Sequence, residues 1–358
     1  QRPFKYTPPT GYKKLNTYNL PDSSIKDGSQ YFDVSTWSGV SDPYNVVTKF
    51  SPDLVWIKGR NFVNNHNLVD TIRGNTKRLA SNLTDAESTI SFFDSFNSDG
   101  YTVSSSTFTN NPIVGWSWRG SDSTAVSNTD GTITSTVSAN PTSGFSVVTY
   151  TGNGTAGATV GHGLGATPKV MIIKNRSDSG LTSDWNVYHE DLGNAGSLFL
   201  NLTSAYFANP AKFNNTSPTS SVYTVGTSNE TNGSGDNMLA YCFAEVEGFS
   251  KFGAYIANSS TDGPFIYTGF RPAFVIEKNT SRSQEWIMHD SKRKTYNVVD
   301  VYLRPDSSSA EGSGSNQIDI LSNGFKIRTS GDGINYTSGD TFIYMAFASH
   351  PLKHSLAR

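Results

Sequence analysis

SPDLVWIK, residues 51–58, is the first of three related segments from which the architecture of this chain can be read. The second is TPKVMIIK at residues 167–174, and the third is RPAFVIEK at residues 271–278. A proline and a lysine lie six positions apart in every copy. The copies are separated by roughly 100 residues, which is the length of a small domain and too long for a solenoid repeat. The sequence therefore predicts three similar units.

Each segment has the pattern of a β-strand that is buried on both faces. Proline comes first, where its missing N–H costs the sheet least. Apolar residues then occupy both alternating faces, with Leu54 and Trp56 on one and Val55 and Ile57 on the other. This pattern indicates a central strand inside a sandwich. Lys58 is in phase with Leu54 and Trp56, and we expect its stem to pack while its ammonium group stays in water.

The flanking elements recur in the same order around each copy. A second alternating strand follows each lysine, then a turn and a strand, and finally a strand rich in aromatic residues. The aromatic strands are WSW at 116–118, YCFA at 241–244 and YMAFA at 344–348. We therefore predict an all-β fold of three tandem repeated β-sandwich units, jelly-roll-like, that superpose on one another. The residues predicted to be buried at the middle of the segments are Trp56, Ile172 and Ile276.

The predicted organisation follows from these repeats. The N-terminal residues mix prolines, aromatic residues and basic residues, which favours an extended arm. Residues rich in Ser, Thr, Asn and Gly separate the first two units, although alternation over 131–137 also indicates a strand there. We predict an extended N-terminal arm at 1–30, β-sandwich repeat 1 at 31–120, a linker at 121–143, repeat 2 at 144–248, repeat 3 at 249–350 and a C-terminal tail at 351–358.

Composition excludes several classes of protein. Charged residues make up 16% of the chain and aromatic residues 12%, which is the opposite of a disordered composition. Few charges and many aromatic residues fit short β-strands joined by polar turns. The formal net charge of −2 gives no field that favours nucleic acid, and no apolar run approaches the length of a membrane span. We therefore expect neither nucleic-acid binding nor membrane insertion.

The single cysteine, Cys242, excludes an intrachain disulfide framework. It lies within the apolar segment 239–243, so we predict a buried and inert thiol. The chain begins Gln1-Arg2-Pro3 without a signal-peptide pattern. We expect it to be a fragment of a longer protein or a processed product.

Three motifs that could carry chemistry have simpler explanations. GNGTAG at residues 152–157 matches the dinucleotide fingerprint by letters, but a proline-led strand follows instead of a helix, so a turn is predicted. The six histidines have no spacing typical of a metal site. We interpret Lys292-Arg293-Lys294 as a solvated loop. With no nucleophile motif in the sequence, we predict a protein that is not an enzyme, with no catalytic residue, no metal ligand and no cofactor.

Several segments resemble large virion proteins of tailed bacteriophages, marine ones especially. Residues 7–17 and 19–21 are similar to the junction after a SPRY-type domain in those proteins, and residues 127–137, 269–272 and 346–348 are similar to the repeat module that follows it. The resemblance covers nearly the whole chain and implies a tail-fibre or other appendage protein. It implies a place on the virion, outside the cell, and contacts with other tail proteins. It brings no catalytic residues with it.

We therefore expect a structural virion protein that takes part in host-cell attachment by binding a surface glycan or protein. Two alternatives stay open: a tail polysaccharide depolymerase, which would need a carboxylate pair in one groove, and a capsid decoration or head-fibre protein without a receptor. Phage fibres that this chain resembles are commonly homotrimers, so we expect a homotrimer, although three linked units could also form a pseudo-threefold knob from one chain. No ligand-binding residue is assigned, but residues 228–235 form the long polar loop where we expect receptor contacts.

Overall fold

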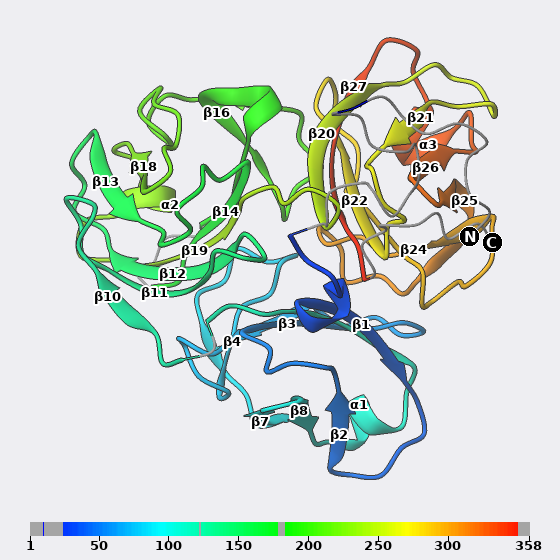
Figure 1. Cartoon of the computed structure of the whole chain (residues 1–358), viewed down its shortest axis with the longest axis horizontal. Coiled ribbons are helices and arrows are strands. Elements are labelled where there is room, and N and C mark those ends of the chain that lie inside the picture. Colours follow the sequence, from blue (N-terminus) through cyan, green and yellow to red (C-terminus); the bar gives the residue numbers. More distant parts are fainter. Residues whose placement is uncertain (1–9, 11–23, 122, 178–182, 350–358) are drawn as a thin grey trace.

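The structure is a computed structural model that describes residues 24–121, 123–177 and 183–349, together with Thr10. Three lobes surround a common centre (Figure 1). The first lobe comprises residues 32–118, the second 126–243 and the third 250–347. Strands dominate the described residues, in which the α-helices are single turns: α1 (Ser106–Thr109), α2 (Asn229–Asn232) and α3 (Asp332–Asn335). The prediction of an all-β fold is confirmed.

The first lobe contains two main antiparallel sheets and one small ladder. The larger sheet has the order β1-β9-β3-β4, and its strands are β1 (Phe32–Trp37), β9 (Ile113–Trp118), β3 (Leu54–Gly59) and β4 (Asn67–Asp70). The smaller sheet has the order β2-β8-β7, and its strands are β2 (Tyr44–Val47), β8 (Gly100–Val103) and β7 (Phe93–Asn97). The ladder consists of β5 (Lys77–Arg78) and β6 (Ser88–Thr89).

The second lobe contains a large sheet and a two-stranded sheet. The large one has the order β10-β11-β12-β19-β14-β15-β16-β17. Its strands are β10 (Val126–Asn128), β11 (Ser135–Asn140), β12 (Phe145–Thr151), β19 (Asn237–Phe243), β14 (Val170–Asn175), β15 (Asn186–His189), β16 (Gly193–Phe199) and β17 (Phe207–Ala208). The small sheet pairs β13 (Ala158–Gly161) with β18 (Val222–Val225).

The third lobe contains two four-stranded sheets. The first has the order β20-β27-β22-β23, and its strands are β20 (Ser250–Ile256), β27 (Thr341–Phe347), β22 (Phe274–Asn279) and β23 (Ile287–Asp290). The second has the order β21-β26-β25-β24, and its strands are β21 (Phe265–Tyr267), β26 (Gly324–Ile327), β25 (Gly312–Leu321) and β24 (Val299–Tyr302). Short 3-10 turns, η2 (Gly28–Gln30) and η3 (Glu190–Leu192), complete the described elements.

One strand order occurs in all three lobes. The series β1-β9-β3-β4, β12-β19-β14-β15 and β20-β27-β22-β23 place equivalent strands side by side. We call β3, β14 and β22 the motif strands and β9, β19 and β27 the aromatic strands. Their register also agrees, because the first residue of each motif strand is paired with the last residue of the aromatic strand beside it. These pairs are Leu54 with Trp118, Val170 with Phe243, and Phe274 with Phe347. The lysine is the fifth of six residues in every motif strand, as the repeat predicts.

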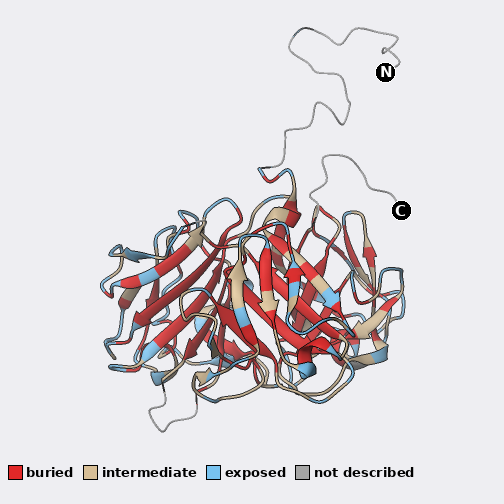
Figure 2. Cartoon of the chain, turned by 90° about the horizontal axis from the view of Figure 1, so that it is seen from below, coloured by how far each residue is buried: buried red, intermediate tan, exposed pale blue. Residues whose placement is uncertain are grey.

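Each motif strand contributes to two hydrophobic cores, because alternate side chains point to opposite faces. Leu54 and Trp56 face a central core that all three lobes share, whereas Val55 and Ile57 face a core within the first lobe. The second and third lobes have their own separate cores in the same way. The strands near the centre are accordingly buried along most of their length (Figure 2). Trp56, Ile172 and Ile276 are all buried, which confirms their predicted placement.

Part of the predicted linker belongs to the second lobe. Within residues 121–143 the structure contains β10 and β11, and β11 pairs with β12 along its whole length from Ser135 to Asn140. The alternating segment 131–137 overlaps this strand. Most of the predicted arm, 1–30, lies outside the described residues, as does the predicted tail, 351–358.

The first and last described segments of the body touch each other. A Cβ atom added to Gly28 would lie 2.7 Å from Ala348 O, so the backbones of the two segments are in close approach. Tyr31 packs edge-on against Phe249, whose ring also contacts Phe347 of the central core. The body therefore begins and ends at the same end of the central core.

Candidate functional site

The lysines of the three repeated segments lie in the interior of the protein. Lys58, Lys174 and Lys278 are each fully buried, so the expectation that their ammonium groups stay in water is wrong. The reason is that a neighbouring lobe covers the exit of each motif strand. Burial lowers the pKa of each lysine to about 8, which leaves the ammonium form predominant at neutral pH.

Every one of these lysines binds backbone from the lobe before it in the cycle: Lys174 of the second lobe binds the first, Lys278 of the third binds the second, and Lys58 of the first binds the third. The bonding segments are equivalent in the three lobes, and we call them the clasps: residues 80–87, 199–206 and 304–311. Each ammonium group also bonds oxygens of its own lobe, as in Lys278, which reaches Asn279 O and Gln284 O. The clasp carbonyls are Thr84 O, 2.8 Å from Lys174 Nζ; Thr203 O, 2.9 Å from Lys278 Nζ; and Ser308 O, 3.4 Å from Lys58 Nζ.

A second donor layer repeats the same cycle. The donor is the residue immediately before β4, β15 or β23, and it donates a ring N–H to a clasp carbonyl. This carbonyl lies four residues before the carbonyl that accepts from the lysine. In the first lobe this residue is His66, whose neutral ring accepts from Trp56 Nε1 and so donates through Nε2. The pairs are Trp185 Nε1 with Ala80 O at 2.9 Å, Trp286 Nε1 with Phe199 O at 2.8 Å, and His66 Nε2 with Arg304 O at 2.9 Å.

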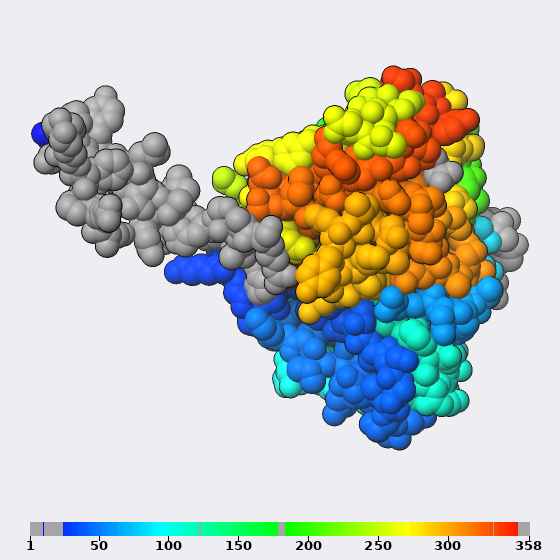
Figure 3. Space-filling model, turned by 90° about the vertical axis from the view of Figure 1, so that its right-hand side faces the viewer, coloured from blue at the N-terminus to red at the C-terminus, as the bar shows by residue number. Residues whose placement is uncertain are grey.

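Backbone hydrogen bonds complete each junction. Three positions after the lysine acceptor, a clasp N–H donates to a carbonyl just beyond the neighbouring motif strand. The pairs are Glu87 N with Arg176 O, Tyr206 N with Thr280 O, and Glu311 N with Arg60 O. The first lobe thus clasps the second, the second clasps the third, and the third clasps the first. The lobes form a closed pseudo-threefold ring, and Figure 3 shows the third lobe lying directly against the first.

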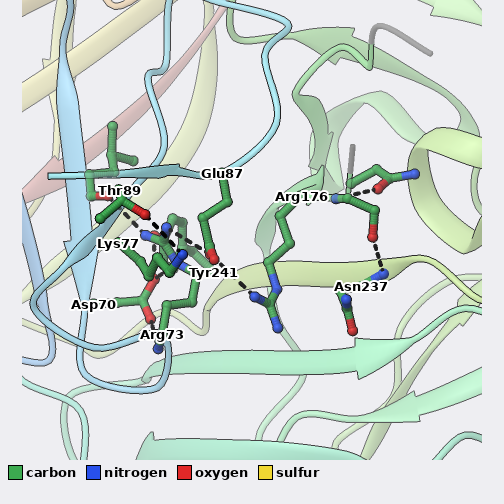
Figure 4. A network of polar contacts seen from close by, with 11 residues as sticks. Asp70, Arg73, Lys77, Glu87, Thr89, Arg176, Asn237 and Tyr241 are labelled. Atoms are coloured by element: carbon green, nitrogen blue, oxygen red, sulfur yellow. Dashed lines mark hydrogen bonds and ion pairs between the residues drawn. The ribbon is translucent and has the colours of Figure 1, made fainter. Parts of the chain in front are cut away.

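Among the described residues, ion pairs join neighbouring lobes at two of the three junctions. At the first–second junction, Glu87 accepts from Arg73 of its own lobe and from Arg176 of the second lobe, at 3.5 and 3.2 Å (Figure 4). Arg73 is itself held by Asp70, which also accepts from the Tyr241 hydroxyl. Buried charges need such complete pairing to be tolerated.

The third–first junction repeats this arrangement. Glu311 accepts from Arg293 of its own lobe at 3.0 Å and from Arg60 of the first lobe at 2.9 Å, and Asp290 holds Arg293. Arg293 is therefore a buried structural residue, and the interpretation of Lys292-Arg293-Lys294 as a solvated loop is wrong for its middle residue. At the second–third junction the equivalent positions hold Tyr206 and His189.

The other sequence candidates have structural roles among the described residues. Residues 152–157 connect β12 to β13 through a turn, as predicted. No group of three or more His, Cys, Asp and Glu side chains is placed to hold a metal ion in the part of the chain described here. Cys242 is buried, and burial raises the pKa of its thiol to about 12, which makes it inert. No described helix has the length and apolar character needed to cross a membrane.

The polar loop at 228–235 is buried in its middle and exposed at both sides. It contains the helical turn α2, and Thr231 and Asn232 within it are fully buried. The Asn232 amide group donates to Asn153 Oδ1, Thr155 O and Gly226 O, which ties the turn to the neighbouring strands. This segment therefore braces the second lobe, while Asn229, Ser234 and Gly235 are exposed, so receptor contacts in this loop stay a prediction.

The outer sheet of the third lobe presents a surface that sequence reasoning missed. We call it the aromatic face: Phe265 and Tyr267 of β21 point outward and are 45% and 64% exposed, while Ile266 between them is buried. Beside them on β26 lie Lys326, paired with Phe265, and Gly324, paired with Tyr267. The signal was available as alternate aromatic residues in a three-residue strand.

The chain matches one described protein family. Residues 27–351 match a domain of unknown function (DUF7483), and because this match spans most of the sequence, the chain belongs to that family. No curated protein and no solved structure matches the chain.

Proposed function

We propose that this member of the DUF7483 family is a structural virion protein of a tailed bacteriophage. In this proposal it forms part of a tail fibre or another external appendage and takes part in attachment to the host cell. The sequence resemblance to phage appendage proteins suggests this role. The structural observation that supports it is the closed ring of three lobes made by a single chain.

The ring suits a protein that must stay folded outside the cell. Its lobes are joined by buried hydrogen bonds at all three junctions and share one apolar core. Opening the ring at any junction would expose lysine and backbone groups that are now paired, which costs free energy for each group. We further propose that the lobes are three tandem β-sandwich units of jelly-roll type, which the repeated strand order supports.

The position of the chain ends supports a knob that is held from one side. Because Gly28 and Ala348 lie in contact, connections to other parts of an appendage leave from one end of the ring. In this arrangement the outer sheets of the lobes and the opposite end of the ring are free to meet a host surface. Loops and sheets carried on a rigid β-scaffold commonly provide such contacts.

Labelling of intact virions tests this proposal. Antibodies raised against the purified chain should decorate a tail or capsid appendage in electron micrographs of phage particles that encode it. The purified chain should also reduce phage adsorption to host cells by competition, whereas a heat-denatured sample should not. Intact virions that bind no antibody, although the disrupted particles contain the antigen, would place the protein inside the particle and overturn the proposal.

A further inference from the structure

We infer that the aromatic face of the third lobe binds a carbohydrate, namely a polysaccharide segment of at least two sugar rings. The inference rests on the proposed function, because it assigns the receptor class and the surface that meets it. Phe265 and Tyr267 are alternate residues of one strand, so their Cα atoms are roughly 7 Å apart and their side chains lie on the same face. This spacing allows adjacent sugar rings to stack on adjacent side chains.

Glycine residues keep this surface flat. A Cβ atom at Gly324 would lie 3.2 Å from Cε2 of Phe265, so the phenyl ring covers the bare backbone of β26. The Tyr267 hydroxyl lies 3.6 Å from the corresponding position at Gly269. Each aromatic side chain therefore passes close to a glycine, which has no side chain to cover it. Aromatic faces carry partial negative charge, which attracts the C–H groups of a pyranose.

Polar groups lie beside the rings at positions that suit sugar hydroxyls. Across the sheet, Phe265 is paired with Lys326, which is paired in turn with Asp319 of β25. Lys326 also bonds Asp262 at 2.7 Å, and Asp262 is almost completely exposed. The ammonium group of Lys326 provides hydrogen-bond donors, and the carboxylates of Asp262 and Asp319 provide acceptors, so neither sign of charge dominates. This favours a neutral carbohydrate over a strongly charged one.

The other two lobes provide an internal comparison. The strand register makes Asn45 of β2 and Thr159 of β13 equivalent to Phe265, and Val47 and Gly161 equivalent to Tyr267. In the first lobe the neighbouring side chains bond one another, with Thr102 Oγ1 donating to Asn45 Oδ1 at 2.6 Å. The fold therefore does not need aromatic residues here. Their presence in one lobe alone points to a function of that lobe.

Two other occupants would use the same place differently. β21 has a single hydrogen-bonded neighbour, β26, so its other edge could accept a peptide strand by main-chain pairing. A second copy of the chain could also cover the two rings. The flat rings and the mixed polar groups favour the carbohydrate, and association of two copies is a separate outcome of the test below.

Affinity gel electrophoresis of the full chain tests this inference. The probes are dextran, galactomannan and laminarin, three neutral polysaccharides, each cast into a native gel beside a gel without polysaccharide. The native chain should be retarded by at least one of them. The double substitution Phe265→Thr/Tyr267→Gly, which installs the residues of the second lobe, should reduce the apparent affinity by about tenfold or more.

Three controls separate binding from folding. Phe207→Thr removes an aromatic side chain of similar exposure in the second lobe and should leave retardation unchanged. Phe265→Asn/Tyr267→Val, which installs the first-lobe residues, is a second variant in case the glycine weakens β21. Thermal melting should show each variant folded, and only variants that fold enter the comparison.

Several outcomes overturn the inference. These are no retardation of the native chain by any of the three polysaccharides, equal retardation of the folded double variants, and concentration-dependent self-association that the double substitutions abolish. The inference and the proposed function fail separately. If both double variants still compete with phage adsorption, the aromatic face is not the receptor site, but the proposed function stands. If polysaccharide retards the native chain but antibodies do not label intact virions, the proposed function fails, but carbohydrate binding stands.

Discussion

At the scale of single residues, the three lobes act as controls for one another. Asn82 accepts a hydrogen bond from His66 N, and Asn201 accepts one from Trp185 N. Each asparagine also donates through its amide nitrogen, Asn82 to Asn65 and Asn201 to Asp184. The equivalent residue in the third lobe is Asp306, which accepts from Trp286 N at 3.4 Å. Asp306 Oδ1 has no hydrogen-bond partner among the described residues. An acid thus stands where the other lobes use an amide.

Burial raises the pKa of Asp306 to about 6, and the nearby Glu285 adds to the shift. Because the folded pKa lies above the unfolded value near 3.8, the folded state holds this proton more tightly. The stabilisation is fully present below pH 3.8 and is lost as the pH rises through 6. At neutral pH the buried carboxylate therefore opposes folding.

We predict that Asp306→Asn raises the free energy of unfolding at pH 7.5 by about 1–3 kcal/mol. The amide would donate to Glu285, as the equivalent amide of Asn201 donates to Asp184. Urea unfolding at pH 7.5 and 4.5 measures this change, and the gain should shrink at the lower pH. The reverse substitution, Asn201→Asp, is the matched control and should destabilise at pH 7.5. An equal gain at both pH values would contradict the account.

The buried lysines set a second test at this scale. Desolvation opposes their charge, but the ammonium group of Lys278 donates to three carbonyl oxygens, Thr203 O, Asn279 O and Gln284 O. Lys278→Met would leave all three without this donor, although Thr203 O would keep the Gln284 N–H. Each buried carbonyl left without a partner costs about 1–3 kcal/mol. We predict a net loss of about 2–5 kcal/mol in unfolding free energy, because the removed desolvation offsets part of that cost. Lys169→Met, at a partly exposed lysine, should change it little, and a stabilised Lys278→Met would show that desolvation wins.

At the scale of elements, the motif strands stabilise the fold because both of their faces are buried. Ile172 of β14 lies in the central core, between strands β19 and β15. We predict that Ile172→Ala lowers the free energy of unfolding by about 2–5 kcal/mol, because the truncation leaves a cavity in a closely packed core. Chemical denaturation provides the measurement, and Val47→Ala on the exposed face of β2 should have an effect near zero. A small effect at Ile172 would mean that the core refills the space.

The sequence predicted these elements well and their junctions poorly. Alternation and the proline–lysine spacing were sufficient to locate β3, β14 and β22 and to assign both faces. The prediction that the lysine ammonium groups stay in water was wrong because their environment depends on the clasps. The clasps contact them through the carbonyls of Thr84, Thr203 and Ser308. A pseudo-threefold knob was one of the alternatives that the repeats suggested, but backbone groups leave no residue pattern, so the contacts that close the ring could not be predicted.

The details of the two surfaces were harder to predict for a different reason. The polar character of residues 228–235 was visible, but the burial of Thr231 and Asn232 depends on hydrogen bonds such as the one from Asn232 to Gly226 O. The aromatic face was hidden in a three-residue strand, and only the strand register shows that Phe265 and Tyr267 point outward. Placing them outside requires knowing which neighbour covers the strand.

At the scale of the whole molecule, the ring bears on the oligomeric state. Its three junctions are satisfied within one chain, which supports a pseudo-threefold knob made by a single copy. We predict that residues 24–349 alone are monomeric and that the expected homotrimer depends on the arm at 1–30. Light scattering of the full chain and of the shortened chain compares the two. A trimer of the shortened chain would contradict this prediction, and a monomer of the full chain would reject the homotrimer.

The contact between Gly28 and Ala348 has a consequence for protein engineering. Since the two ends of the body touch, a short linker could join them without distorting either segment. The chain could then be opened between two lobes, at residue 248 for example, to give a circular permutant that starts with the third lobe. A ring whose lobes hold one another through equivalent junctions should accept any of the three as its starting point. The same geometry would let the body be inserted as a module into a surface loop of another protein.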